Sequence, residues 1–160
     1  MGNDRSRAWE RAKMGVAALV AAGALIGGPQ AALASHRTYD YAVLATDFRF
    51  HGVPSVLPTA DYDTTFINLG QVPHVLVAVH LGPECQDLST DEAIAILDLS
   101  EEEVFAACPG TSVNGDTFAF GGGRSQGSLT VLSGQNWFVC FVDNHYQLGM
   151  LKSVRGISVG

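Results

Sequence analysis

WFVCFVDNHYQLGM, residues 137–150, begins as an apolar run of β-forming residues and ends in a polar loop that contains glycine. Cys140, His145 and Met150 follow one another within it at the spacing C-x4-H-x4-M. A thiolate, an imidazole and a thioether are soft or borderline metal ligands. Each of the three is more often a packing residue when it occurs alone, so the interpretation depends on the rest of the chain.

The first 34 residues have the layout of a secretory signal peptide. Four basic residues precede the apolar run 14–28, and Ala32-Leu33-Ala34 offers a cleavage site before Ser35. The run is short for a membrane span, and an uncleaved anchor is the alternative. We therefore expect export to a secreted, periplasmic or cell-envelope location. The mature chain, residues 35–160, is expected to form one domain without stable membrane insertion.

Without this leader the chain is strongly acidic. It keeps 5 basic and 14 acidic residues, because the leader holds 4 of the 9 basic and 2 of the 16 acidic ones, and its net charge is about −9. Such a chain repels nucleic acid and anionic lipid, so neither is an expected partner. The acidity suits a basic protein partner, and it also keeps many exported proteins soluble.

Three cysteines, Cys85, Cys108 and Cys140, lie in the expected mature chain. Cysteines tend to pair in an oxidising compartment. Cys85 and Cys108 bracket a polar, helix-like segment, which a disulfide between them would stabilise by about 3 kcal/mol in the chain-entropy model. Cys140 would then be the odd cysteine, which in an exported protein indicates an intermolecular bridge, a reactive thiol or a metal ligand.

Short strands and turns account for most of the mature chain. β-forming residues occupy 39–50, 64–70, 72–82, 128–134, 136–142 and 149–160, and the proline-containing segment 51–63 is expected to turn. We expect 128–134 and 136–142 to form a hairpin, and strands to resume after the glycine-rich stretch 120–127. Two capping boxes, Ser89 with Glu92 and Ser100 with Glu103, predict helices at 90–98 and 101–107. The fold class is therefore all-β, a Greek-key β-sandwich with a short helical insertion at about 89–107.

A second imidazole would complete a known ligand set. His74 lies where a loop enters a strand, so it can sit at one end of the sandwich beside the loop that carries Cys140. Two histidines, a cysteine and a weak axial methionine form the donor set of blue-copper centres. His80 lies about 20 Å further along the strand at about 3.3 Å per residue and cannot share the ion. His51 has no obvious partner, and His36 would be near a solvated terminus.

The pairing of PHVLVAVHL (73–81) with WFVCFVDNHYQLGM (137–150) resembles the cupredoxins, the small blue-copper proteins. The loop spacing is most similar to rusticyanin-type loops and then to azurin-type loops, and the likeness covers most of residues 38–159. It implies a cupredoxin-like domain with one copper ion, Cu+/Cu2+, whose ligands are His74, Cys140, His145 and Met150. Val75 departs from the family pattern, in which Asn commonly follows the upstream histidine, and the departure bears on the reduction potential.

One-electron transfer rather than catalysis is the function that the resemblance implies. The protein would be a monomer that is not an enzyme and exchanges electrons with a redox partner protein of unknown identity. His145 would lie near the surface as the exit for the electron. Tyr146, Leu148 and Gly149 could form part of an apolar docking patch around it, although simple loop packing is equally consistent with these residues.

Two other functions are compatible with the same residues. The first is an extracytoplasmic copper carrier or scavenger, which the absence of Met-rich or His-rich tracts disfavours. The second is an interaction module on a cupredoxin fold with an optional metal, whose acidic helical insertion faces a basic partner.

Zinc is disfavoured because a thioether is a poor zinc ligand. A binuclear copper loop would need a second cysteine between Cys140 and His145.

Overall fold

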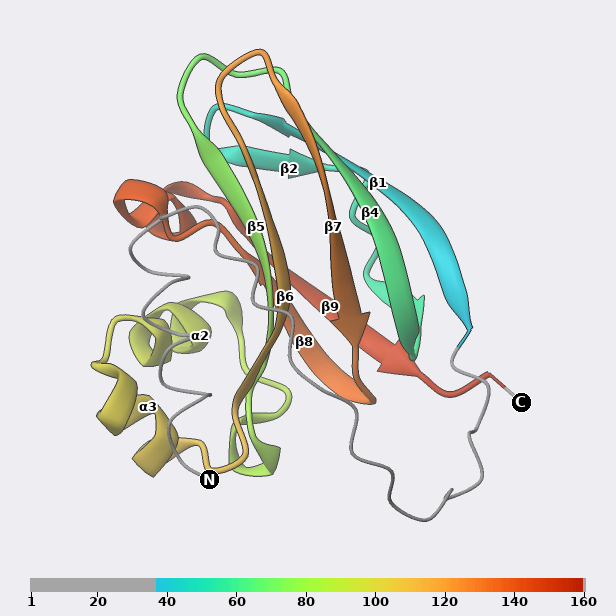
Figure 1. Cartoon of the computed structure of the whole chain (residues 1–160). Helices are drawn as coiled ribbons and strands as arrows, with labels where there is room; N and C mark the ends of the chain where they lie inside the picture. Colours follow the sequence, from blue (N-terminus) through green and yellow to red (C-terminus); the bar gives the residue numbers. More distant parts are fainter. Residues whose placement is uncertain (1–36, 160) are drawn as a thin grey trace, which may run out of the picture.

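Two β-sheets packed face to face form the body of the structure, a computed structural model that describes residues 37–159 (Figure 1). The first sheet has the order β2-β1-β4-β7, with β1 Thr38–Thr46, β2 Arg49–His51, β4 Ala60–Asn68 and β7 Arg124–Val131. The second has the order β3-β9-β8-β5-β6, with β3 Val56–Pro58, β5 His74–His80, β6 Ser112–Ala119, β8 Gly134–Val139 and β9 Leu151–Ile157. Pairing is antiparallel except between β1 and β4 and between β3 and β9.

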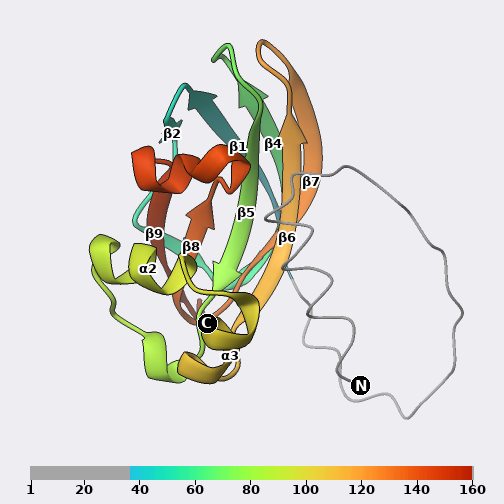
Figure 2. The ribbon, with the colours of Figure 1, turned by 90° about the vertical axis from the view of Figure 1, so that its left-hand side faces the viewer.

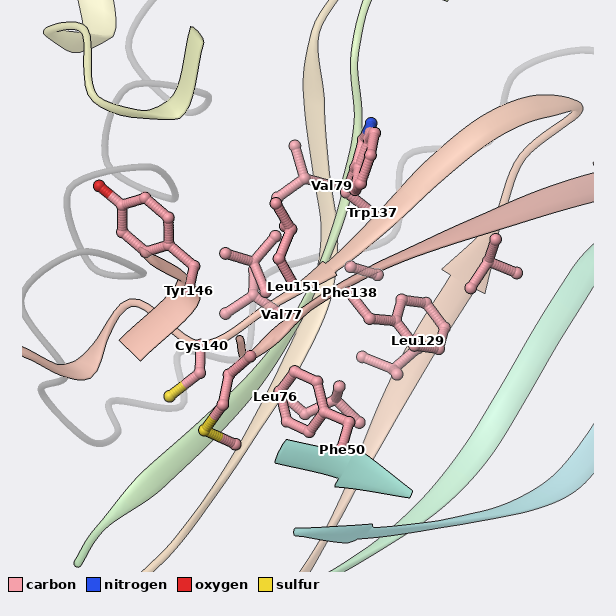
Figure 3. Close-up of a cluster of buried hydrophobic side chains, with 14 of the residues drawn as sticks. Phe50, Leu76, Val77, Val79, Leu129, Trp137, Phe138, Cys140, Tyr146 and Leu151 are labelled. Atoms are coloured by element: carbon pink, nitrogen blue, oxygen red, sulfur yellow. The ribbon is translucent and has the colours of Figure 1, made fainter. Parts of the chain in front are cut away.

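The core lies between the sheets and is filled by large apolar side chains. β4 buries alternate residues, as expected for a strand with one face on the core. In β5 the first six of seven residues are buried, because its outer face is also covered. Figure 3 shows Phe50, Leu76, Leu129 and Phe138 gathered in this core. The all-β sandwich predicted from the sequence is confirmed.

The helical insertion lies between β5 and β6 and covers the outer side of the five-stranded sheet (Figures 1 and 2). It contains the short 3-10 turn η1 Pro83–Cys85 and the helices α2 Thr90–Leu97 and α3 Glu101–Ala107. Both predicted capping boxes are present. A disulfide joins Cys85 to Cys108 and so connects the two ends of the insertion.

Several strand predictions need correction. The predicted hairpin of 128–134 with 136–142 is wrong: β7 pairs with β4 in one sheet, whereas β8 pairs with β5 and β9 in the other. The Asn136 side chain holds this crossover, because it accepts a hydrogen bond from the Leu132 N–H at 3.0 Å and donates to the Leu132 carbonyl at 2.7 Å. The proline-containing segment 51–63 also includes the short strand β3 and the start of β4.

A further correction concerns β6. Strands were expected to resume only after the glycine-rich stretch 120–127, but β6 already precedes it. Asn114-Gly115 has the composition of a turn, yet it forms a β-bulge opposite the register shift between Val77 and Val79 of β5. Gly115 has a φ of 106° and packs against the backbone of Ser128. A side chain could not be accommodated at this close approach of β6 to β7, which explains a glycine inside a strand.

Residues 1–36 and Gly160 lie outside the described part of the chain, and the predicted signal peptide of residues 1–34 therefore does as well. Among the helices that the structure describes, none has the length and apolar character needed to span a bilayer.

The capping boxes make the helical insertion sensitive to acid. Hydrogen bonds from the Ser89 hydroxyl and then from its backbone N–H lower the pKa of Glu92 below its ordinary value, and Ser100 lowers the pKa of Glu103 in the same way. A carboxylate with a depressed folded pKa contributes stability above its unfolded pKa, and this stability is lost as the pH falls through the folded value. We expect the wild type to lose stability progressively below about pH 4.5.

Urea unfolding at a series of pH values tests this expectation. The double variant Glu92→Gln/Glu103→Gln should show a flatter pH dependence than the wild type between about pH 5 and 3. Glu102→Gln is the matched control, since Glu102 lies on α3 outside the capping box. Equal slopes for the wild type and the double variant would contradict the assignment.

Candidate metal centre

His74 opens β5 after a loop whose backbone is held by Asn68. The Asn68 amide donates hydrogen bonds to the carbonyls of Val72 at 2.8 Å and Ala119 at 3.1 Å, and its Oδ1 accepts one from the Gly70 N–H at 2.9 Å. Asn68 and His74 are both fully buried. The loop before β5 is thus connected to the end of β6, and this holds the backbone where it enters β5 at His74.

Cys140 and Met150 continue the ladder of β8 and β9 by one pair. Val139 pairs with Leu151, and the Cys140 N–H donates a hydrogen bond to the Met150 carbonyl at 3.1 Å. Residues directly opposite on neighbouring antiparallel strands carry their side chains on the same face. Both side chains are fully buried. The ladder therefore places the methionine thioether on the same side of the sheet as the cysteine thiol.

The loop between them, which we call the ligand loop (residues 141–149), turns back sharply to present His145. Its helical part is η2 Val142–Leu148. Asp143 and Asn144 have φ values of 43° and 58°, in the left-handed region that Asp and Asn tolerate better than most residues. The Met150 N–H donates to the His145 carbonyl at 3.1 Å, which closes the loop.

The helical insertion anchors the ligand loop. The Tyr146 hydroxyl donates a hydrogen bond to Oδ1 of Asp98 at 2.5 Å, and the Gln147 amide donates to the same oxygen at 2.7 Å. Tyr146 is only 4% exposed, so its ring is packed inside the molecule and is not available to the apolar docking patch in which it was expected. Figure 3 draws it with the other buried side chains. Leu148 and Gly149 are exposed, as a docking role would require.

Three donor atoms meet where the start of β5, the end of β8 and the ligand loop come together. The Nδ1 atoms of His74 and His145 lie 3.1 Å apart, and Sγ of Cys140 lies 3.8 Å from the first and 3.7 Å from the second. Donors bound to one ion at about 2.0–2.3 Å would be separated by roughly 3.3–3.8 Å. The three residues are buried, and their chemistry and spacing fit a single metal ion of borderline softness.

The burial of the site controls the protonation of its donors. Burial raises the pKa of the Cys140 thiol to about 11. Burial also lowers the pKa values of His74 and His145, which favours neutral imidazoles with a free lone pair. The Val75 backbone N–H donates a hydrogen bond to the Cys140 sulfur at 3.4 Å. The main chain therefore supplies a donor to the sulfur although the Asn that commonly follows the upstream histidine in the resemblance is replaced by valine.

The His145 side chain is buried, with 5% of its surface exposed. The Phe48 ring packs edge-on against the His145 ring, with centroids 5.1 Å apart and an interplanar angle of 85°. Phe48 is itself 41% exposed. The buried imidazole is therefore in contact with an aromatic residue that reaches the surface.

Sequence reasoning missed several residues that build this site. Asp47 and Phe48 form the turn between β1 and β2, inside a segment whose composition favours continuous strand. The Asp-containing turn was a signal that could have divided it. Asn68 and Gly70 have the composition of a turn, which was a further signal, because Asn68 accepts a hydrogen bond from the Gly70 N–H two residues away. Asp98 had no such signal, since its partners Tyr146 and Gln147 lie 48 and 49 residues further along the chain.

No family model matches the chain, and no curated protein matches it. Among solved structures it is similar to auracyanin A of the green thermophilic photosynthetic bacterium Chloroflexus aurantiacus, a "blue" copper protein, with 18% identity, a TM-score of 0.52 and coverage of 76% of this chain and 100% of that one. The reduced auracyanin of Roseiflexus castenholzii is 18% identical, with a TM-score of 0.51 and coverage of 74% and 96%. Auracyanin B is 16% identical, with a TM-score of 0.51 and coverage of 74% and 88%. At such identities the likeness establishes the fold, which is the cupredoxin β-sandwich.

Proposed function

We propose that this protein binds one copper ion and transfers single electrons. His74, Cys140 and His145 would hold the ion, with the Met150 thioether as a further, weak ligand. The observation that carries the proposal is the meeting of these three buried donors, whose atoms all lie within 4.8 Å of one another on a cupredoxin fold. Such a donor set suits copper better than zinc because thiolate and thioether are soft ligands.

The protein itself would contribute a set of ligands that is held in place before the metal binds and is buried from solvent. Copper, when bound, supplies a couple between Cu(I) and Cu(II) that exchanges one electron. The Asn68 contacts, the β8–β9 ladder and the Asp98 anchor each hold one of the ligand-bearing segments. A site held in this way changes little between oxidation states, which is what rapid electron exchange requires.

We propose that electrons leave through His145 toward an apolar surface around Phe48. Leu148 is 60% exposed, and Gly149 next to it is exposed as well. The ring contact between Phe48 and His145 connects this surface to the site. The partner would be a redox protein that covers the surface with apolar side chains of its own, and the chain would act as a monomer without a catalytic role.

We also propose that the protein is exported. It rests on the leader-like residues 1–34, and the disulfide between Cys85 and Cys108 supports an oxidising compartment. Residues 35–160 would then form the mature single domain.

A visible and EPR spectrum of the protein loaded with Cu(II) tests the proposal. We expect one copper per chain, an intense blue or green band and narrow copper hyperfine splitting. Stopped-flow mixing with a redox protein and, separately, with a copper chelator distinguishes the function from copper carriage. Rapid electron exchange with slow loss of metal is expected; a colourless copper complex, or metal loss faster than electron exchange, would refute the proposal.

A further inference from the structure

The turn between β1 and β2 brings a carboxylate to the far side of the His74 imidazole. Oδ1 of Asp47 lies 3.5 Å from Nε2 of His74. Within residues 37–159 that nitrogen is buried and makes no hydrogen bond. The separation is longer than a normal N–H···O hydrogen bond, so the interaction is electrostatic. The Asp47 side chain is 38% exposed, whereas the imidazole is fully buried.

The backbone around Asp47 sets the position of this carboxylate. Its Oδ1 accepts a hydrogen bond from the Gln71 N–H at 2.9 Å, in the loop that leads into His74. Gly70 packs directly against the Asp47 side chain, where a Cβ atom would collide with it. The two loops therefore approach closely because position 70 is glycine, and the approach directs the carboxylate toward the imidazole.

The two nitrogens of His74 face different surroundings. Nδ1 faces Nδ1 of His145 at 3.1 Å and Sγ of Cys140 at 3.8 Å, whereas Nε2 faces only the carboxylate among the contacts described above. A carboxylate favours a proton on the nitrogen that it faces, and in a neutral imidazole this leaves the other nitrogen with a free lone pair.

We propose that Asp47 is a positioning residue of the copper centre, which holds the proton of His74 on Nε2, directs the Nδ1 lone pair to the metal, and favours Cu(II) over Cu(I) through its negative charge. This inference rests on the proposed function. Carboxylates behind metal-binding histidines increase the basicity of the ligand, and their loss commonly costs 10–100-fold in metal affinity. Partial exposure screens the charge, so the expected effect lies near the lower end of that range.

Asp47→Asn tests the role of the charge, because an Asn oxygen can still accept the hydrogen bond from Gln71. Competition titrations with Cu(I) and Cu(II) chelators should show that the ratio of Cu(II) to Cu(I) affinity falls by about tenfold, with a corresponding rise in reduction potential. Asp63→Asn, which removes the same charge from the exposed outer face of β4, should leave the ratio unchanged. Equal weakening of both affinities, or no change, would reduce Asp47 to a loop contact and overturn the proposal.

The tautomer of His74 gives a readout that needs no metal. In metal-free protein in mildly alkaline buffer, the imidazole 15N shifts of the wild type should report a proton on Nε2. Asp47→Asn should increase the share of the Nδ1–H form, and Asp63→Asn should not. A wild-type His74 with its proton mainly on Nδ1 would overturn the inference even if the copper spectrum is as proposed. Conversely, an Nε2–H tautomer with no blue copper spectrum would refute the proposed function and leave the contact between Asp47 and His74 established.

Discussion

Replacement of Cys140 by serine is expected to abolish the intense visible band of the copper-loaded protein and to weaken Cu(II) binding by more than about 100-fold. We expect more than about 100-fold because the loss of a residue that only supports a ligand commonly costs about 10–100-fold in metal affinity, whereas this substitution would remove a proposed ligand. The band arises from charge transfer between thiolate sulfur and copper, which a hydroxyl cannot replace. Absorption spectra and chelator competition measure the two effects.

Two histidines on the same strand supply the matched control for this result. His74→Ala should weaken Cu(II) binding strongly and remove the blue spectrum. His80→Ala removes an imidazole whose Nε2 lies 3.1 Å from the Ser133 carbonyl, at the other end of β5, and should leave the copper spectrum unchanged. Retention of the band in Cys140→Ser, or its loss in His80→Ala, would place the metal elsewhere in the molecule.

Loss of the disulfide is expected to lower the free energy of unfolding by about 3 kcal/mol in the double variant Cys85→Ala/Cys108→Ala. The two cysteines are 23 residues apart, and a loop of that length has this chain-entropy value. The insertion that the bond closes also carries Asp98, which anchors the ligand loop through Tyr146. Urea unfolding of metal-free protein measures the loss, and a weaker anchor should also speed the release of copper.

Reductant provides the control for the disulfide prediction. Wild-type protein with the disulfide reduced should be destabilised about as much as the double variant, and the variant itself should not respond to reductant. If reduction leaves the stability of the wild type unchanged, then the helical insertion is held by its buried residues alone. The principal candidates for that packing are Ala93, Leu97 and Val104, all of which are fully buried.

The parts of the fold that were predictable are those with a local signal. Each capping box lies within four residues, so Ser89 and Ser100 identified both helices to within a residue at each end. The alternation of apolar residues indicated β-strands, but it did not show which strands pair. The predicted hairpin failed for this reason, since β7 and β8 are adjacent in the sequence and belong to different sheets.

The sequence by itself determined which side chains are candidate donors, because Cys140, His145 and Met150 lie within one short segment and His74 opens a strand. Only the tertiary structure decided how these groups are supported. Asp47 faces His74, Val75 offers its backbone N–H to the sulfur, and Asp98 withdraws Tyr146 from the surface. These contacts join segments of different strands and helices. No local pattern encodes them, since they depend on how the two sheets and the insertion pack together.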